Sequence, residues 1–428
     1  MKVAVLGSSL TALVAATALA STGNDVVLLL PDNTTGRSLL AGDWPYREAG
    51  LQTLMNEQRA SKRLFFLSLD DAALPVAQVY WIATEPGELP LVEQFWARLP
   101  QPQQPLVAVV QTSFPLGTSE QLAMLLEQVF PERETAVVCF PEMLQGGVAL
   151  ESFMRPVSLF AGIEKPFAED VFRELMRPFN RLRDVLHIMR LREAEFTKLS
   201  INGMLATRLG FMNEMAALAE TLGVDIDVVR QGMGSDTRIG ESYLYPGCGF
   251  GGSKFSRNLQ SLVEVLHEND VSSSLLDQVL KINEQQKELL FRKLWRHYDT
   301  RLAGRTVALW GVAYKPGTER GDEAPSLAII KALLAQQVTV AVHDPKALSA
   351  LADVFPGETG IRYHNDPYNA LQDADALMLV TEWKHYWSPD FPCMKQLMRE
   401  PVLLDGRNIY SPDYVTSQGF TYYGIGRG

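Results

Sequence analysis

Residues 2–20, KVAVLGSSLTALVAATALA, decide the fold of this protein. The run KVAVL has the length of a buried strand, Gly7 interrupts it, and a helical pattern extends from Leu10 to Ala20. A lysine followed by apolar residues is also found in secretory signal peptides. A second apolar run, VVLLL at 26–30, continues the pattern, so we predict a buried strand–helix–strand unit.

Further apolar runs alternate with helical stretches along the chain. In the first part of the chain, we expect strands at 79–83, 106–111 and 135–140. In a second block that begins at Arg305, we expect strands at 306–312, 338–345, 376–383 and 402–406 and a helix at 326–337. Strands that alternate with helices indicate doubly wound parallel sheets.

The segment between these blocks has a helical pattern. Residues 193–222 contain few helix breakers and carry apolar residues at helical spacing. Such a stripe is typical of a protein core or a dimer seam rather than of a cofactor site.

Composition excludes several classes of function. The net charge of −11 argues against non-specific binding to nucleic acid or anionic lipid. The cysteines at 139, 248 and 393 are odd in number and widely spaced, which predicts neither a disulfide framework nor a metal site and fits a reducing, cytoplasmic location. Since no run approaches about 18 apolar residues, we expect no membrane span.

Several segments resemble signatures of the UDP-glucose/GDP-mannose dehydrogenase family, in the family's order and over nearly the whole chain. They are TSFPLGT (112–118), FPEMLQGGVAL (140–150), FTKLSINGMLATRLGFMNE (196–214), PGCGFGGSKF (246–255), GVAYKPGT (311–318), TEW (381–383), DGRNIY (405–410) and YYGIGR (422–427). Each segment alone is a weak signal, whereas the ordered set is a strong one.

The resemblance implies an α/β fold of two Rossmann-like doubly wound domains joined by a long central helix. It places an N-terminal NAD domain at 1–190, a central helical domain at 191–300 and a C-terminal sugar-nucleotide domain at 301–428. It also implies a reaction, in which two successive hydride transfers to NAD oxidise the sugar's C6 alcohol to a carboxylate through a thiol-bound intermediate. UDP-glucose is the commonest substrate of the family, and a homodimer built on the central helices is the usual assembly.

The cofactor turn departs from its fingerprint at one position. Gly7, Ser9 and Ala12 occupy the three small-residue positions, and the Cβ atom of Ser9 would crowd the pyrophosphate. By alignment with the family, Leu30 stands where a carboxylate normally binds the ribose, and Asp32 is the nearest acid. NAD is therefore the expected cofactor, and weakened or lost binding is an alternative.

The thiol of the family is replaced. Lys254 occupies its position, and Cys248 lies before the glycines and cannot simply take over. A lysine amine can form an imine with an aldehyde, but no acyl intermediate follows readily from it. The other interpretation of Lys254 is a cation close to the sugar or its phosphate.

Other family positions are partly retained. Asn258 replaces the carboxylate that helps to activate water, and it cannot accept a proton. Thr118, Glu142, Lys198 and Asn202 match supporting catalytic residues, and the last two lie one helical turn apart. This pattern predicts an active site that retains its supporting catalytic residues but lacks the nucleophile.

The sugar-nucleotide pocket is also mixed. The residues predicted to bind substrate are Phe250, Gly251, Gly252, Ser253, Lys315 and Arg407. Asp322 stands where relatives carry an arginine that reaches the substrate, and an acid there would repel a diphosphate. Ser158 replaces a second expected arginine.

Three hypotheses follow. The first is a catalytically impaired relative that binds a sugar nucleotide, as a sensor or as the regulatory partner of an active paralogue. The second is an active NAD-dependent UDP-glucose 6-dehydrogenase with altered chemistry. The third is a structural subunit in which only the oligomer interface matters.

Overall fold

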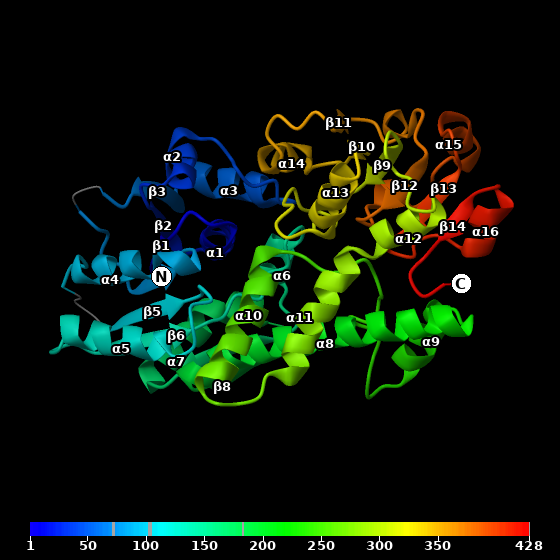
Figure 1. The fold of residues 1–428 in the computed structure, drawn as a ribbon. Coiled ribbons are helices and arrows are strands. Elements are labelled where there is room, and N and C mark those ends of the chain that lie inside the picture. The colour runs from blue at the N-terminus through cyan, green and yellow to red at the C-terminus, as the bar shows by residue number, and fades with distance from the viewer. Residues whose placement is uncertain (71–72, 102–104, 182–183, 428) are drawn as a thin grey trace. The chain divides into compact units, whose positions relative to one another are not determined.

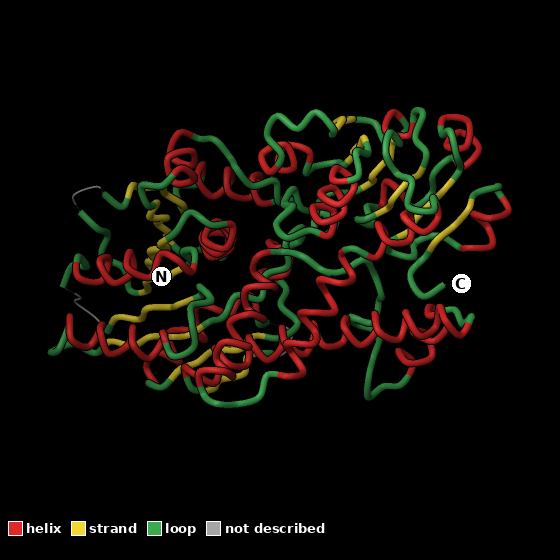
Figure 2. The backbone as a smooth tube through the Cα atoms, in the orientation of Figure 1, coloured by secondary structure: helices red, strands yellow, loops and turns green. Residues whose placement is uncertain are grey.

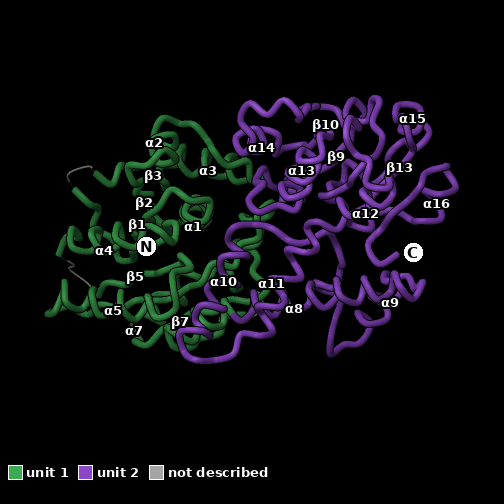
Figure 3. Tube along the Cα trace, in the orientation of Figure 1, with its two compact units in different colours: residues 1–199 green, residues 200–428 purple. Residues whose placement is uncertain are grey.

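A computed structural model describes residues 1–70, 73–101, 105–181 and 184–427. The chain divides into two compact units, Met1–Leu199 and Ser200–Gly428, which Figure 3 draws in different colours. Each unit contains one sheet with helices packed against it (Figures 1 and 2). The predicted α/β class with two parallel-sheet domains and a long joining helix is confirmed.

The described part of the first unit is built on an eight-stranded sheet with the order β3-β2-β1-β4-β5-β6-β7-β8. The strands are β1 (Lys2–Leu6), β2 (Asp25–Leu30), β3 (Leu64–Ser68), β4 (Val79–Ile82), β5 (Leu106–Val110), β6 (Thr135–Cys139), β7 (Leu159–Ile163) and β8 (Leu186–Met189). Pairing is parallel except between β6 and β7. The strand order reverses between β1 and β4, and such switch points form ligand crevices at the carboxyl ends of the strands.

Helices cover both faces of this sheet because alternate strand residues point to opposite sides. The helices are α1 (Leu10–Ser21), α2 (Thr34–Ala41), α3 (Leu51–Ala60), α4 (Leu89–Ala97), α5 (Thr118–Val129), α6 (Ala149–Met154) and α7 (Pro166–Met176). Residues from α1, α3, α6 and α7 share one core cluster with the sheet, and residues from α4, α5 and the start of α8 share another. Every residue of α1 from Thr11 to Ala20 is buried, which explains why this helix is apolar all round.

The long central helix is α8, which runs for 32 residues from Leu191 to Leu222. It confirms the unbroken helical stretch predicted at 193–222. Its final part and the helices α9 (Ile226–Ser235), α10 (Ser253–Glu268), α11 (Ser274–Lys287) and α12 (Leu289–His297) open the second unit.

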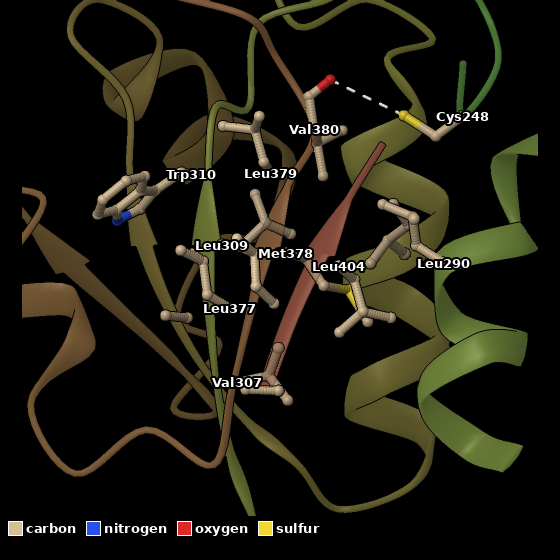
Figure 4. Packing of buried hydrophobic residues seen from close by; sticks show 14 of the residues in the cluster. Cys248, Leu290, Val307, Leu309, Trp310, Leu377, Met378, Leu379, Val380 and Leu404 are labelled. Atoms are coloured by element: carbon tan, nitrogen blue, oxygen red, sulfur yellow. Dashed lines mark hydrogen bonds between the residues drawn. The ribbon is translucent and has the colours of Figure 1, made fainter. Parts of the chain in front are cut away.

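The second unit contains a six-stranded parallel sheet with the order β11-β10-β9-β12-β13-β14. Its strands are β9 (Thr306–Trp310), β10 (Thr339–His343), β11 (Ile361–His364), β12 (Ala376–Leu379), β13 (Val402–Asp405) and β14 (Thr421–Tyr423). The flanking helices are α13 (Pro325–Ala335), α14 (Leu348–Val354), α15 (Phe391–Leu397) and α16 (Pro412–Ser417). Figure 4 shows the core, where Leu290 of α12 packs against strand residues such as Leu404.

Candidate functional site

The turn after β1 has the geometry of a dinucleotide turn. Gly7 has a φ of +139°, and a Cβ atom there would lie 2.4 Å from the carbonyl oxygen of Ala83. Only glycine fits this position, because a side chain would collide with the backbone at the end of β4. The completely buried Ala12 allows α1 to pack closely on the sheet.

Ser9 is the N-cap residue of α1, and its hydroxyl is used within the protein. The Oγ atom accepts a hydrogen bond from the Ala12 N–H at 3.2 Å and donates one to the Ala83 carbonyl at 2.7 Å. The N–H groups at the start of such a helix normally face the pyrophosphate. The backbone conformation of this turn is therefore suited to binding a dinucleotide. The side chain of Ser9 is the one difference from the glycine fingerprint at the three small-residue positions.

The end of β2 carries no free acidic side chain of the kind that normally binds the ribose. Leu30 is fully buried, and the exposed carboxylate of Asp32 pairs with Arg37 at 2.7 Å. Instead, the neighbouring residue Asn33 reaches the glycine turn, since its Nδ2 atom donates to Ser8 Oγ at 3.1 Å. Sequence reasoning missed Asn33, although an asparagine ahead of a helix is a recognisable N-cap signal.

The predicted catalytic residue Lys198 lies close to the segment that contains Glu142. The Nζ atom of Lys198, on α8, lies 3.6 Å from Met143 Sδ, and Met143 directly follows Glu142. Thr118 is the buried first residue of α5. The structure thus brings Lys198 to the segment that carries Glu142.

Glu195 holds the loop before α5 and was not identified from sequence. Its carboxylate accepts hydrogen bonds from the backbone N–H groups of Gly117, at 2.6 Å, and Ser119, at 2.8 Å. Burial raises the pKa of this carboxyl, although the hydrogen bonds oppose that shift. Glu195 lies one helical turn before Lys198 on α8, so it fixes this loop to the helix that carries a predicted catalytic lysine.

In the second unit, the glycine loop before α10 is fixed by close contacts. Asn283 of α11 accepts from the Phe250 N–H at 2.8 Å and donates to the Phe250 carbonyl at 3.1 Å. A Cβ atom at Gly251 would lie 2.5 Å from the Glu323 carbonyl oxygen, and one at Gly252 would lie 3.0 Å from the Tyr314 ring. Both glycines are therefore required by packing.

Charged residues meet at the start of α10. Ser253 and Lys254 are the first two residues of this helix, and Asn258 is buried one turn further on. Arg320 donates to Ser253 Oγ at 3.0 Å and pairs with Asp322 at 2.6 Å. Asp322 is thus paired with Arg320, a cation that was not identified from the sequence.

Cys248 lies in the core of the second unit. It is fully buried, and its Sγ atom lies 3.8 Å from the carbonyl oxygen of Val380 (Figure 4). Burial raises the pKa of this thiol, which disfavours the nucleophilic thiolate. The environment of Cys248 therefore agrees with the prediction that it does not replace the missing nucleophile.

Arg407 follows β13 and is mostly buried. Its Nε atom donates to the Val380 carbonyl at 2.7 Å and lies 3.3 Å from a carboxylate oxygen of Glu382.

Two other predicted site residues have defined surroundings. Lys315 Nζ lies 5.9 Å from the centroid of the Tyr314 ring, and Asn202 is buried on α8. The catalytic and binding roles assigned to these residues stay predictions.

In the described ranges, no group of three or more histidine, cysteine, aspartate or glutamate side chains is arranged to hold a metal ion. Over the same ranges, none of the helices has the length and apolar character needed to cross a membrane.

Two doubly wound sheets, one with a glycine turn at its switch point, define a two-domain protein of the dinucleotide-dependent dehydrogenase class. Three domain models of the UDP-glucose/GDP-mannose dehydrogenase family match the chain: the NAD binding domain at 1–180, the central domain at 192–285 and the UDP binding domain at 308–412. The chain therefore belongs to the UDP-glucose/GDP-mannose dehydrogenase family.

Individual relatives are similar over their full length. A UDP-glucose 6-dehydrogenase of Pseudomonas aeruginosa is 39% identical over 100% of this chain and 98% of its own. One of Rhizobium meliloti is 31% identical over 100% of both chains. The solved UDP-glucose dehydrogenase of Pyrobaculum islandicum superimposes with a TM-score of 0.88 at 26% identity, covering 100% of this chain and 98% of that one.

These matches confirm the predicted family, NAD as the cofactor and a sugar nucleotide as the class of substrate. NAD, when bound, supplies the hydride acceptor of an oxidoreductase.

Proposed function

We propose that this chain binds NAD and a UDP-sugar and that its oxidation of the sugar is impaired. UDP-glucose is the first candidate, because the relatives in Pseudomonas aeruginosa and Rhizobium meliloti are named UDP-glucose 6-dehydrogenases. The observation that carries the proposal is Lys254, which stands at the family's thiol position at the start of α10, directly after the fixed glycine loop.

The impairment falls on the second of the two oxidations. Removing a hydride from an alcohol to give an aldehyde needs a base but no covalent adduct. Removing a hydride from the aldehyde needs a tetrahedral adduct that can become an acyl intermediate, which a thiolate supplies, whereas a lysine amine forms an imine with the aldehyde. The buried Cys248 offers no replacement, and Asn258 cannot accept a proton from water.

We propose that NAD binds more weakly here than in a protein whose glycine turn matches the complete fingerprint. The Cβ atom of Ser9 occupies space where a second glycine would let the pyrophosphate approach the backbone. Its hydroxyl also occupies the Ala12 N–H at the start of α1.

An active dehydrogenase with altered chemistry is the second candidate. Lys198 beside Met143, next to Glu142, supports it, because these residues match the supporting catalytic positions of the family. In this alternative Lys254 has a role in the reaction. The same fold also suits a regulatory partner of an active paralogue.

A homodimer is proposed for the assembly. Three apolar residues of α8 are exposed at seven-residue spacing: Met204, Phe211 and Leu218, with exposed fractions of 63%, 46% and 50%. Residues seven apart lie on one face of a helix, and such a seam is typical of helix–helix association.

The three-part division into 1–190, 191–300 and 301–428 is retained as a proposal for the domains.

The first experiment follows NADH absorbance on mixing the protein with NAD and UDP-glucose, with NADP, GDP-mannose and UDP-N-acetylglucosamine in parallel. Thermal unfolding with and without each ligand is measured on the same samples. Stabilisation by UDP-glucose with no more than one NADH formed per sugar is the expected result. Two NADH per sugar would favour the active enzyme, and no stabilisation by any sugar nucleotide would contradict the proposed binding.

A further inference from the structure

The end of β2 lacks the group that usually recognises the ribose of NAD. In dinucleotide folds an acid at this point accepts hydrogen bonds from the adenosine ribose. Here Leu30 is buried in the apolar core, and the carboxylate of Asp32 is paired with Arg37. A carboxylate that reached this subsite from another loop would supply the missing acceptor for the ribose of NAD.

Glu88 brings a carboxylate to this place from the other side of the switch point. It ends the short 3-10 helix η1 (Pro86–Glu88), which follows β4. Its Oε1 atom accepts from Asn33 Nδ2 at 3.1 Å, and its Oε2 atom accepts from the Glu85 N–H at 2.8 Å. Both oxygens are therefore held in place while the side chain stays only half-buried.

Asn33 connects this carboxylate to the glycine turn. Its Nδ2 atom also lies 3.1 Å from Ser8 Oγ, and its Oδ1 atom caps α2 by accepting from the Gly36 N–H at 2.7 Å. Ser8, Asn33 and Glu88 thus link the loops that follow β1, β2 and β4. These loops border the crevice in which a dinucleotide lies across the sheet.

We propose that Glu88, positioned by Asn33, accepts hydrogen bonds from the adenosine ribose hydroxyls and makes the site selective for NAD over NADP. Each carboxylate oxygen can accept more than the one bond it makes here, and bonds from hydroxyls to a carboxylate are charge-assisted. The same negative charge repels the 2′-phosphate of NADP. Arg37, the nearby cation that would attract that phosphate, is paired with Asp32.

The test titrates NAD and NADP separately into the full chain by calorimetry, without sugar nucleotide. Loss of one charge-assisted bond corresponds to about a tenfold change in affinity. We expect the wild type to bind NAD more tightly than NADP. Glu88→Gln should lower the affinity for NAD by about tenfold and reduce the difference between the affinities for NAD and NADP. Asn33→Ser, which keeps a cap for α2 but loses the amide donor, should also weaken NAD.

Glu93→Gln is the matched control, because Glu93 is an exposed acid on the neighbouring helix α4. It should bind both nucleotides as the wild type does, and thermal unfolding of each variant verifies folding. The proposal is overturned if Glu88→Gln binds NAD like the wild type, if Asp32→Asn alone weakens NAD, or if the wild type binds NADP as well as NAD or fails to bind NAD. The inference depends on the NAD binding of the proposed function, but the titration needs neither turnover nor a UDP-sugar. A failure here leaves the UDP-glucose stabilisation test unaffected.

Discussion

Asn283 forms hydrogen bonds with both backbone polar groups of Phe250, at 2.8 Å to the N–H and 3.1 Å to the carbonyl. The two residues are 33 positions apart, and the pair ties the glycine loop ahead of α10 to the buried side of α11. A loop fixed in this way presents its backbone to a ligand without being ordered by the ligand itself, which lowers the entropic cost of binding.

Replacing Asn283 with alanine should loosen this loop. The change leaves the Phe250 N–H and carbonyl without their partner, so we expect a loss of about 2–3 kcal/mol in the free energy of unfolding. Stabilisation by UDP-glucose should decrease as well. Urea denaturation measures the first effect, and Gln285→Ala, an exposed change on the same helix, should leave both quantities unchanged.

Restoring the family's nucleophile should restore turnover. In the double variant Lys254→Cys, Asn258→Asp, a thiol and a carboxylate return to the start of α10. We expect NADH formation from NAD and UDP-glucose, measured by absorbance, with two NADH per sugar oxidised. The single variant Asn258→Asp is the control and should form no more than one NADH per sugar. An inactive double variant that still binds NAD would contradict the assignment of Lys254 as the cause of impairment.

Ser9→Gly should strengthen NAD binding at a cost in stability. It removes the Cβ atom from the pyrophosphate site and also removes the bonds to Ala12 and Ala83. We expect a several-fold gain in NAD affinity and a loss of about 1 kcal/mol in unfolding free energy. Calorimetric titration and urea denaturation measure the two effects. Unchanged affinity would show that the Ser9 side chain does not limit cofactor binding.

Glu195 should make stability depend on pH. Burial raises the pKa of its carboxyl in the folded state, so the folded protein binds a proton more readily than the unfolded chain. Its contribution to stability therefore falls as pH rises from the usual glutamate range through the raised folded value. The difference in unfolding free energy between wild type and Glu195→Gln should favour the wild type more at low pH than at neutral pH. A difference that is independent of pH would contradict this account.

The exposed stripe on α8 should mediate self-association. Phe211→Glu places a charge at the middle of the three apolar residues, and burying an unpaired charge is costly. We expect the variant to elute as a monomer under conditions where the wild type is a dimer, measured by light scattering. Leu40→Glu is the control, since Leu40 is 45% exposed on α2, compared with 46% for Phe211. A wild-type monomer would contradict the proposed dimer.

The strands that sequence patterns identified are mostly the central ones. The apolar runs of β1, β2, β4, β5 and β6 are buried on both faces and stand out as continuous hydrophobic segments. The edge strands β3 and β11 were missed, and each has a single buried residue, Leu64 in β3 and Ile361 in β11. An edge strand has fewer neighbours to bury it, so its sequence carries a weaker signal.

The sequence alone determined the α/β class and the family, because these depend on local patterns and ordered motifs; the replacement of the thiol by Lys254 is a prediction from the same motifs. Only the tertiary structure decided that Asn33 meets Glu88, 55 residues away, and that Glu195 caps a loop 78 residues away. The environment of Cys248 was also settled by folding, since burial depends on packing around the whole residue. Local patterns determine strands and helices, whereas hydrogen bonds between distant loops depend on where the folded sheet brings those loops together.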